Sequence, residues 1–379
     1  MATGAAPISL SLELPSGRDA NATNAVLAAM LRTHPHVSDL IFSPGRVPQI
    51  EVNGQLMEIE TKGLRTLNAD DTRRIAADLI GSNKQAITTL REQGACDISY
   101  GLPGLARFRV NVFIQRGSCA VVIRVIPTEI RDVASLRLPH QLEAISSLNE
   151  GIVLITGPRN SGKSSTLAAV VDRINSERLC HIVTIDDPIE FLHNHKKATV
   201  HQRELHSDTP SISMALQSAL RQSPNVIQVS DARDRETMEM ILEAAETGHL
   251  VLCALNTPDV AKTLDKLINM FGSSEYGAIR NRLAKTLRMV VSQRLLPARN
   301  GSGRVLAAEV LSINASVRAI LERNDFASKQ ILDFMAKGTD ESSQALDTAL
   351  SVLVANKDIT LDTACTYATD PERLRAKLS

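Results

Sequence analysis

The sequence predicts an α/β fold in which helices cover both faces of a parallel sheet. After Gly151, segments with helical spacing separate four short apolar runs, at 152–156, 181–185, 226–230 and 250–255. Apolar runs of this kind are typical of parallel strands buried on both faces. The residues before this region mix strand and helix patterns and predict a smaller α+β domain, and those after it predict a helical region.

The predicted α+β domain consists of short strands and helices. Helical spacing begins near Asn24, and residues 38–59 read as two short strands around a Pro/Gly turn. Residues 68–82 begin with Asn and Asp, which are common helix N-cap residues, and continue as a helix. Residues 95–127 alternate apolar and polar over two long runs joined by Gln-Arg-Gly-Ser, which indicates an antiparallel hairpin.

The chain has 379 residues, which suggests two or three domains. The first residues contain neither strand nor helix patterns, and we expect a flexible leader there. From about Asn314, apolar residues recur at three-to-four spacing. The expected segments are a leader at 1–22, an α+β domain at 23–128, a linker and helix at 129–150, an α/β core at 151–312 and a helical region at 313–379.

Composition limits the functional classes. Hydrophobic residues make up 43% and charged residues 22%, as in ordinary globular proteins. Lys+Arg and Asp+Glu are both 42, and this neutrality argues against a nucleic-acid partner. There is no signal-peptide pattern and no uncharged apolar run near 18 residues. The five scattered cysteines show no metal-binding spacing, so we expect free thiols in a cytoplasmic protein.

One motif predicts nucleotide binding directly. Residues 157–164, GPRNSGKS, match G-x-x-x-x-G-K-S/T between a predicted strand and a predicted helix. Glycines let backbone N–H groups turn toward phosphate oxygens, Lys163 adds a positive charge and Ser164 offers a hydroxyl to Mg²⁺. The motif therefore predicts ATP and Mg²⁺ as ligands. The candidate binding residues are Gly157, Pro158, Arg159, Asn160, Ser161, Gly162, Lys163, Ser164 and Ser165.

Acidic residues follow two of the predicted strands. Asp186, Asp187 and Glu190 come after the second strand, and Asp231 follows the third. Open α/β sheets bind ligands at the carboxyl ends of their strands, so these side chains are expected to face the nucleotide. Taken alone, the Asp-Asp-Pro stretch also fits a turn or helix cap. Beside the phosphate loop, Asp187, Glu190 and Asp231 are the predicted catalytic carboxylates, and Asp187 is a candidate Mg²⁺ ligand, directly or through water.

The predicted hairpin of the first domain contains three arginines, Arg107, Arg109 and Arg124. Charges that alternate along a hairpin usually form a solvated face, and spacing alone favours that interpretation. A second group, Arg221, Arg233 and Arg235, surrounds the predicted strand that ends at Asp231, where arginines are able to reach phosphates.

From about Ser38 onward the chain resembles the PilT-type retraction ATPases of type IV pili, a branch of the secretion ATPases. The stretches that carry the resemblance are ARFRVNVFIQRG (106–117), GPRNSGKSSTLAA (157–169), IVTIDDPIEF (182–191), ALRQSPNVIQVSDARDRET (219–237), AAETGHLVLCALNT (244–257), VSQRLLP (291–297) and VRAILERND (317–325). Their order along some 300 residues is that of the family.

The resemblance implies a PAS-like N-terminal domain followed by a RecA-like P-loop ATPase domain. It also implies a homohexamer with nucleotide between subunits, on the cytoplasmic face of the inner membrane. Such a motor retracts pilin through an inner-membrane platform protein and drives twitching motility. By the same resemblance, Arg109 and Arg124 would contact the phosphates and count among the catalytic residues.

The chain departs from the family pattern at four places. Ser230-Asp231 stands where the family has Gly-Glu, Asn256 replaces a His, Asp186 replaces a Glu, and Ile41 replaces a His. Two functions fit this combination. The first is a motor ATPase with reduced turnover, which we expect. The second is a nucleotide-binding accessory or regulatory paralogue with weak or no activity, working with an active PilT paralogue.

Overall fold

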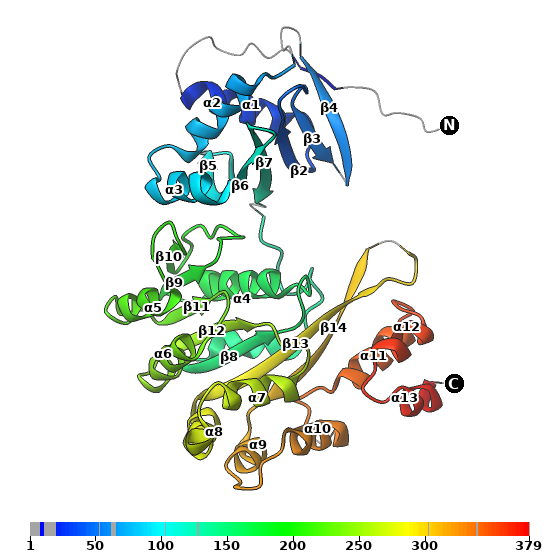
Figure 1. Cartoon of the computed structure of the whole chain (residues 1–379). Helices are drawn as coiled ribbons and strands as arrows, with labels where there is room; N and C mark the ends of the chain where they lie inside the picture. Colours follow the sequence, from blue (N-terminus) through cyan, green and yellow to red (C-terminus); the bar gives the residue numbers. More distant parts are fainter. Residues whose placement is uncertain are drawn as a thin grey trace. The chain divides into compact units, whose positions relative to one another are not determined.

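The computed structural model describes residues 8–10, 20–52, 54–61, 66–102, 104–126, 129–301, 303–338 and 340–378. Most of the predicted leader lies outside these ranges. The chain forms two compact units, with the boundary between Glu129 and Ile130 (Figure 1). Each unit has its own sheet and hydrophobic core.

The N-terminal unit contains a seven-stranded sheet of order β1-β4-β3-β2-β7-β6-β5. Its strands are β1 (Ile8–Leu10), β2 (Val37–Phe42), β3 (Gln49–Val52), β4 (Gln55–Thr61), β5 (Ala95–Leu102), β6 (Ala106–Gln115) and β7 (Ser118–Ile126). Its helices are α1 (Ala20–Arg32), α2 (Ala69–Ile80) and α3 (Lys84–Gln93). The large side chains of Leu27, Phe42 and Phe108 are fully buried in its core.

This unit has more elements than the sequence predicted. Residues 38–59 hold parts of three strands instead of two, because the chain turns again at Gly54, whose φ is +80°. Residues 95–126 form three strands, and the additional turn contains Gly104 with φ +70°. Glycine adopts positive φ without the steric cost of a Cβ, so each Gly allows a tight reversal. Helix α3 was not predicted.

The second unit is built on a seven-stranded sheet of order β10-β9-β11-β12-β8-β13-β14. All neighbouring strands are parallel except β13 and β14. The strands are β8 (Gly151–Thr156), β9 (His181–Asp186), β10 (Thr199–Glu204), β11 (Val226–Val229), β12 (Leu250–Leu255), β13 (Leu287–Pro297) and β14 (Arg304–Ser312). The four predicted strands are confirmed, whereas β10, β13 and β14 were not predicted.

Helices cover both faces of this sheet (Figure 1). Along β8, Ile152 and Leu154 pack into one core while Val153 and Ile155 pack into another on the opposite face. The helical elements of this region are η1 (His140–Ser147), α4 (Lys163–Glu177), α5 (Ile212–Leu220), α6 (Arg235–Glu246), α7 (Val260–Asn269), η2 (Ser273–Glu275) and α8 (Tyr276–Thr286). Burial on both faces explains why the strands lack polar alternation.

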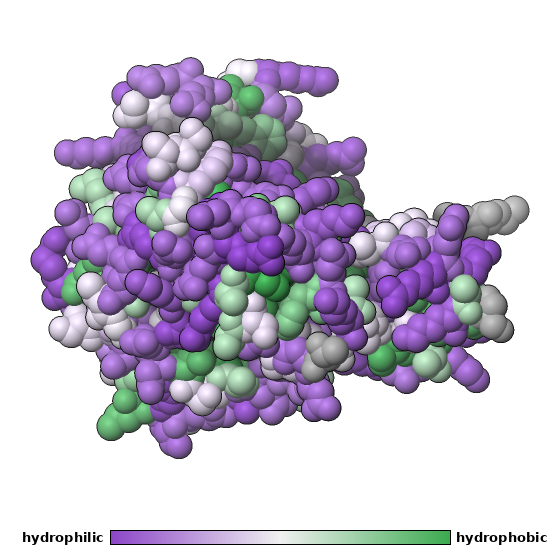
Figure 2. Space-filling model, turned by 90° about the horizontal axis from the view of Figure 1, so that it is seen from below, coloured by the Kyte–Doolittle hydropathy of each residue, from purple (hydrophilic) through white to green (hydrophobic). Residues whose placement is uncertain are grey.

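The C-terminal residues are helical, as predicted: α9 (Ala315–Leu321), α10 (Ser328–Lys337), α11 (Leu346–Ala355), α12 (Leu361–Tyr367) and α13 (Pro371–Leu378). The last three helices form a separate small core with Leu296 of β13 and Ala307 of β14. The β13–β14 pair therefore connects the main sheet with the C-terminal helices. None of the described helices is both long and apolar enough to cross a membrane. The face drawn in Figure 2 is mainly hydrophilic, with scattered hydrophobic residues.

Candidate nucleotide-binding site

The phosphate loop lies between the end of β8 and the start of α4, as the motif predicts. Gly157 has φ +148°, and a Cβ there would collide with the Ser161 side chain and lie 2.5 Å from the carbonyl oxygen of Gln293. Gly162 is the N-cap of α4 and has φ +90°. Glycine is therefore required at both positions, because the loop has a positive φ at each of them and leaves no room for a side chain at Gly157.

Lys163 places its ammonium group inside this loop. Its Nζ donates hydrogen bonds to the carbonyl oxygens of Gly157 at 2.9 Å and Pro158 at 2.8 Å. Burial lowers the pKa of Lys163, while the negative charges of Asp231 and Glu190 act in the opposite direction. A cation held beside carboxylates at the N-terminus of a helix fits a nucleotide phosphate with its metal ion.

Other groups of the loop also fit a polyanionic ligand. Ser164 and Ser165 lie half-buried in the first turn of α4, where backbone N–H groups are unsatisfied within the helix. The Ser161 hydroxyl is buried and has no hydrogen-bond partner among the described residues. Arg159 and Asn160 are exposed at the tip of the loop. The loop thus combines a positive charge, a helix N-terminus and an unpaired polar group.

Asp231 follows β11 and is 7% exposed. Its Oδ2 accepts hydrogen bonds from Arg233 Nε at 2.8 Å and from Asn256 Nδ2 at 3.0 Å. Arg233 also forms an ion pair with Asp187, with 3.2 Å between Nη2 and Oδ2. The hydrogen bond with Asp231 is the main reason that the pKa of Arg233 is raised. One guanidinium therefore links the carboxylates that follow β11 and β9, which are neighbouring strands.

The two adjacent aspartates at the end of β9 have different environments. Asp186 is buried and accepts hydrogen bonds from Thr184 at 2.7 Å and Gln228 at 3.0 Å. Burial raises the pKa of Asp186 to about 6. Asp187 is half-buried, and its backbone N–H donates to Ser230 Oγ at 3.1 Å. Asp186 is thus tied into the sheet, and Asp187 is the carboxylate of this pair that is available for a ligand.

Glu190 is exposed, four residues beyond the end of β9. Its negative charge, like that of Asp231, opposes the lowering of the Lys163 pKa by burial. Asp187, Glu190 and Asp231 thus come from the carboxyl ends of two neighbouring strands, as predicted. Their catalytic roles stay predictions.

The hairpin arginines lie in the N-terminal unit. Arg109 on β6 is directly opposite Arg124 on β7, which is opposite Asp39 on β2. Arg124 Nε lies 3.0 Å from an oxygen of the buried Asp39, and Arg109 Nε lies 3.7 Å from Asp97. Both arginine side chains are more than half exposed, so they are available to bind an anion. Their contribution to the nucleotide site stays a prediction.

Strands β13 and β14 add contacts to the phosphate loop that the sequence analysis missed. Gln293 Nε2 donates to the Thr166 hydroxyl of α4 at 2.7 Å, and Arg304 Nη1 donates to the carbonyl oxygen of Asn160 at 3.2 Å. The three consecutive polar residues at 292–294 interrupt the apolar pattern of β13, so no local signal identified this strand. The pairing of β13 with β8 and of β14 with β13 depends on long-range contacts that no local pattern reveals.

Comparison with known proteins gives a consistent result. Residues 96–352 match the family described as "Type II/IV secretion system protein". The chain is 38% identical over 335 residues to the "Type IV pilus retractation ATPase PilT" of Pseudomonas aeruginosa, covering 88% of this chain and 95% of that protein. It is 39% identical over 307 residues to a "Twitching motility protein" of Neisseria gonorrhoeae, covering 81% of this chain and 80% of the relative.

A crystal structure of the pilus retraction motor PilT with bound ADP is similar to this structure, with a TM-score of 0.82 and 36% sequence identity. The match covers 93% of this chain and 98% of that one. The resemblance inferred from the motifs is confirmed. So is the fold class, with a smaller N-terminal domain before a RecA-like α/β domain.

Proposed function

The chain belongs to the type II/IV secretion system protein family, and from this premise we propose that it is an ATPase motor that retracts type IV pili. The observation that supports this most strongly is the complete phosphate loop beside Asp231 and Asp187. ADP was bound in the similar PilT structure, which supports a nucleotide in the same loop here.

The phosphate loop would hold ATP. Its backbone N–H groups and Lys163 would bind the phosphates. The side chains of Ser164 and Asp187 would hold Mg²⁺, with Asp187 binding it directly or through a water molecule. The metal ion would neutralise negative charge on the phosphates. Mg²⁺ commonly keeps several waters and binds substrate phosphates, so a few protein ligands suffice.

Asp231 is the residue that we assign as the catalytic acid–base group. It would orient the attacking water and accept its proton, with Glu190 nearby adding negative charge. Arg109 and Arg124 would stabilise negative charge on the phosphates, since the positive charge of an arginine stabilises the transition state of phosphoryl transfer. These arginines are far in sequence from the loop, so we propose a homohexamer with nucleotide between subunits.

Turnover is expected to be slow. Asp is one methylene shorter than the Glu that the family pattern places at position 231, a difference of about 1.5 Å. Asn256 donates a hydrogen bond to Asp231 but cannot carry a proton as His can. Arg233 additionally pairs with both Asp231 and Asp187, and its single positive charge offsets part of their negative charge. The shorter acid, the missing histidine and the Arg233 charge each slow proton transfer without weakening nucleotide binding, whereas the Asn256 hydrogen bond keeps Asp231 in place.

We further propose that the ring acts on the cytoplasmic face of the inner membrane, through the pilus platform protein. We prefer this motor to an accessory subunit that assists an active paralogue, because the similar proteins are described as retraction and twitching proteins. The test measures ATP turnover and oligomeric mass of the purified protein beside Lys163→Ala. A hexamer with slow turnover that this substitution removes supports the proposal. A monomer, or turnover that survives, refutes it.

A further inference from the structure

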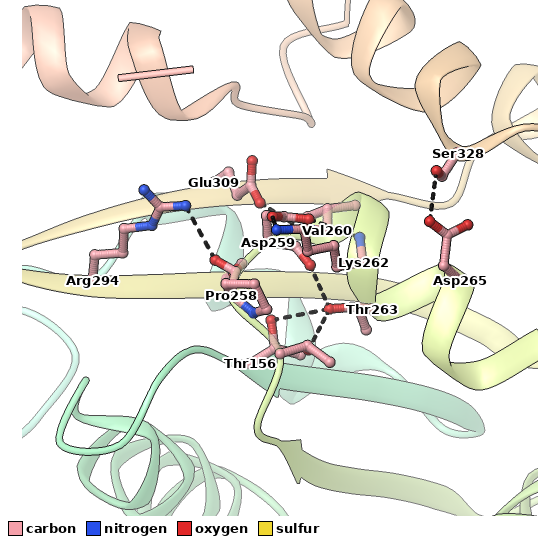
Figure 3. Close-up of polar contacts among 12 residues, drawn as sticks. Thr156, Pro258, Asp259, Val260, Lys262, Thr263, Asp265, Arg294, Glu309 and Ser328 are labelled. Carbon is pink, nitrogen blue, oxygen red and sulfur yellow. Dashed lines mark hydrogen bonds and ion pairs between the residues drawn. The ribbon is translucent and has the colours of Figure 1, made fainter. Parts of the chain in front are cut away.

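A short connection joins Asn256 to helix α7, and a carboxylate from β14 anchors it. Residues 257–259 separate Asn256 from Val260, the first residue of α7. The backbone N–H of Val260 donates to Glu309 Oε1 at 2.5 Å, and Glu309 is only 4% exposed (Figure 3). The first N–H groups of a helix lack partners within the helix, so this side chain satisfies a donor that would otherwise be buried and unpaired.

Two side chains of strand β13 form hydrogen bonds with the same connection. The carbonyl oxygen of Pro258 accepts hydrogen bonds from Ser292 Oγ at 3.2 Å and Arg294 Nη2 at 3.4 Å. The other terminal nitrogen of Arg294, Nη1, donates to the carbonyl oxygen of Tyr367 in the C-terminal helices at 3.0 Å. The connection is thus tied to the helices beyond β14 as well as to the sheet.

Buried hydroxyl groups link the connection to the phosphate loop. Thr257 and Thr263 have their hydroxyl oxygens 2.6 Å apart. Figure 3 shows Thr263 beside Thr156, with 3.4 Å between their hydroxyl oxygens. Thr156 is the last residue of β8, directly before Gly157. All three threonines are buried. A movement at the start of α7 therefore affects both Asn256 and the base of the phosphate loop.

We propose that Glu309 is a positioning residue for ATP hydrolysis, whose carboxylate fixes the start of α7 and thereby holds Asn256 against Asp231. The inference rests on the ATPase function proposed above. Glu309 acts through Val260 and the three residues before it. An ionised carboxylate suits this role, because it accepts a stronger hydrogen bond than a neutral group does. Its negative charge is also attracted to the positive end of the helix dipole, at the helix N-terminus.

The surroundings of Glu309 make its charge sensitive to pH. The charged groups that act on it are Asp259 at the start of α7, Arg294 on β13 and Asp347 on α11, and Lys262 lies 3.9 Å from Asp259. Burial is the main cause that raises the pKa of Glu309 to about 7, while the Val260 hydrogen bond and Arg294 oppose the shift. Below this pH the group becomes neutral, and its hold on α7 weakens. Turnover should therefore rise with pH through about 7.

The experiment compares full-length wild-type protein with Glu309→Gln and Glu309→Ala. ATP turnover is measured at saturating ATP and Mg²⁺ from pH 6 to 8.5, and nucleotide affinity is measured separately. Gln retains an oxygen that accepts the Val260 N–H but cannot ionise. Ser328→Ala is the matched control, since it removes a 2.9 Å hydrogen bond to Asp265, elsewhere on α7.

The wild-type turnover should exceed that of Glu309→Gln by about tenfold at pH 8.5 and match it at pH 6, because displacing a catalytic group by a fraction of an ångström costs that much. Glu309→Ala should be slow throughout, with nucleotide affinity nearly unchanged. Ser328→Ala should follow the wild-type profile. If Glu309→Gln shows the wild-type profile, or if lost affinity explains its slower turnover, the inference is wrong. A wild-type protein with no turnover at any pH would instead refute the ATPase function itself, and this inference with it.

Discussion

Replacing Asp231 by Glu should accelerate hydrolysis. The added methylene moves the carboxylate by about 1.5 Å. A catalytic group must come within about 2.6–3.2 Å of the proton that it accepts, directly or through one water, and a misplacement near 1 Å costs on the order of a hundredfold. Arg233, whose side chain is 62% exposed, is able to follow the longer acid. We therefore expect turnover to rise about tenfold to a hundredfold.

The assay is steady-state ATP hydrolysis by purified Asp231→Glu, alone and combined with Asn256→His, beside a separate measurement of nucleotide affinity. His at position 256 restores a group that can carry a proton next to the acid. Turnover should rise in both variants, while affinity changes by less than about twofold, since the phosphate loop is untouched.

Asp234→Glu is the matched control for this prediction. It makes the same chemical change three residues away, where Asp234 caps α6 by accepting a hydrogen bond from the Thr237 N–H at 2.8 Å. This change should weaken the cap without raising turnover. If Asp231→Glu instead abolishes an already fast ATPase, the site is built around the shorter acid, and our reasoning about its reach is wrong.

Two further predictions concern the hairpin arginines and Glu309. Arg109→Ala should lower turnover at least tenfold, yet change the free energy of unfolding by less than about 1 kcal/mol, because its ion pair with Asp97 is largely exposed; unchanged turnover in this variant would remove Arg109 from the site. The pKa of Glu309 lies at about 7 in the folded protein against an ordinary 4.5, so the folded state binds its proton more readily. The free energy of unfolding of the wild type, relative to Glu309→Gln, should therefore fall by at most about 3 kcal/mol as pH rises from about 4.5 to about 7. Denaturant unfolding at several pH values measures this, and a constant difference would contradict it.

The sequence predicted the parts of the fold that local pattern determines. The apolar runs identified β8, β9, β11 and β12, and the phosphate-loop motif located the start of α4 within two residues. Strand β10 was missed because its residues, Thr199–Glu204, are mostly polar at the edge of the sheet. Strands β13 and β14 were missed because their polar residues, such as Gln293 and Glu309, interrupt the apolar runs used to identify strands.

The candidate site was predicted only in part, because local sequence identifies its residues but does not identify their partners. Residue type and position after a strand were sufficient to propose Asp187 and Asp231. Arg233 contacts both carboxylates because β9 pairs with β11, and this pairing cannot be read from the sequence. That Glu309 reaches the start of α7 depends on the position of β14, at the far edge of the sheet. Long-range pairing therefore determines the partners of the predicted residues.

This chain should hydrolyse ATP at the phosphate loop. The most direct test is multiple-turnover ATP hydrolysis by the purified wild-type protein, measured beside Lys163→Ala prepared in the same way. We expect slow but measurable turnover in the wild type and none in the variant, because the loop loses its main fixed positive charge. Equal turnover in both proteins, or none in the wild type, would contradict it.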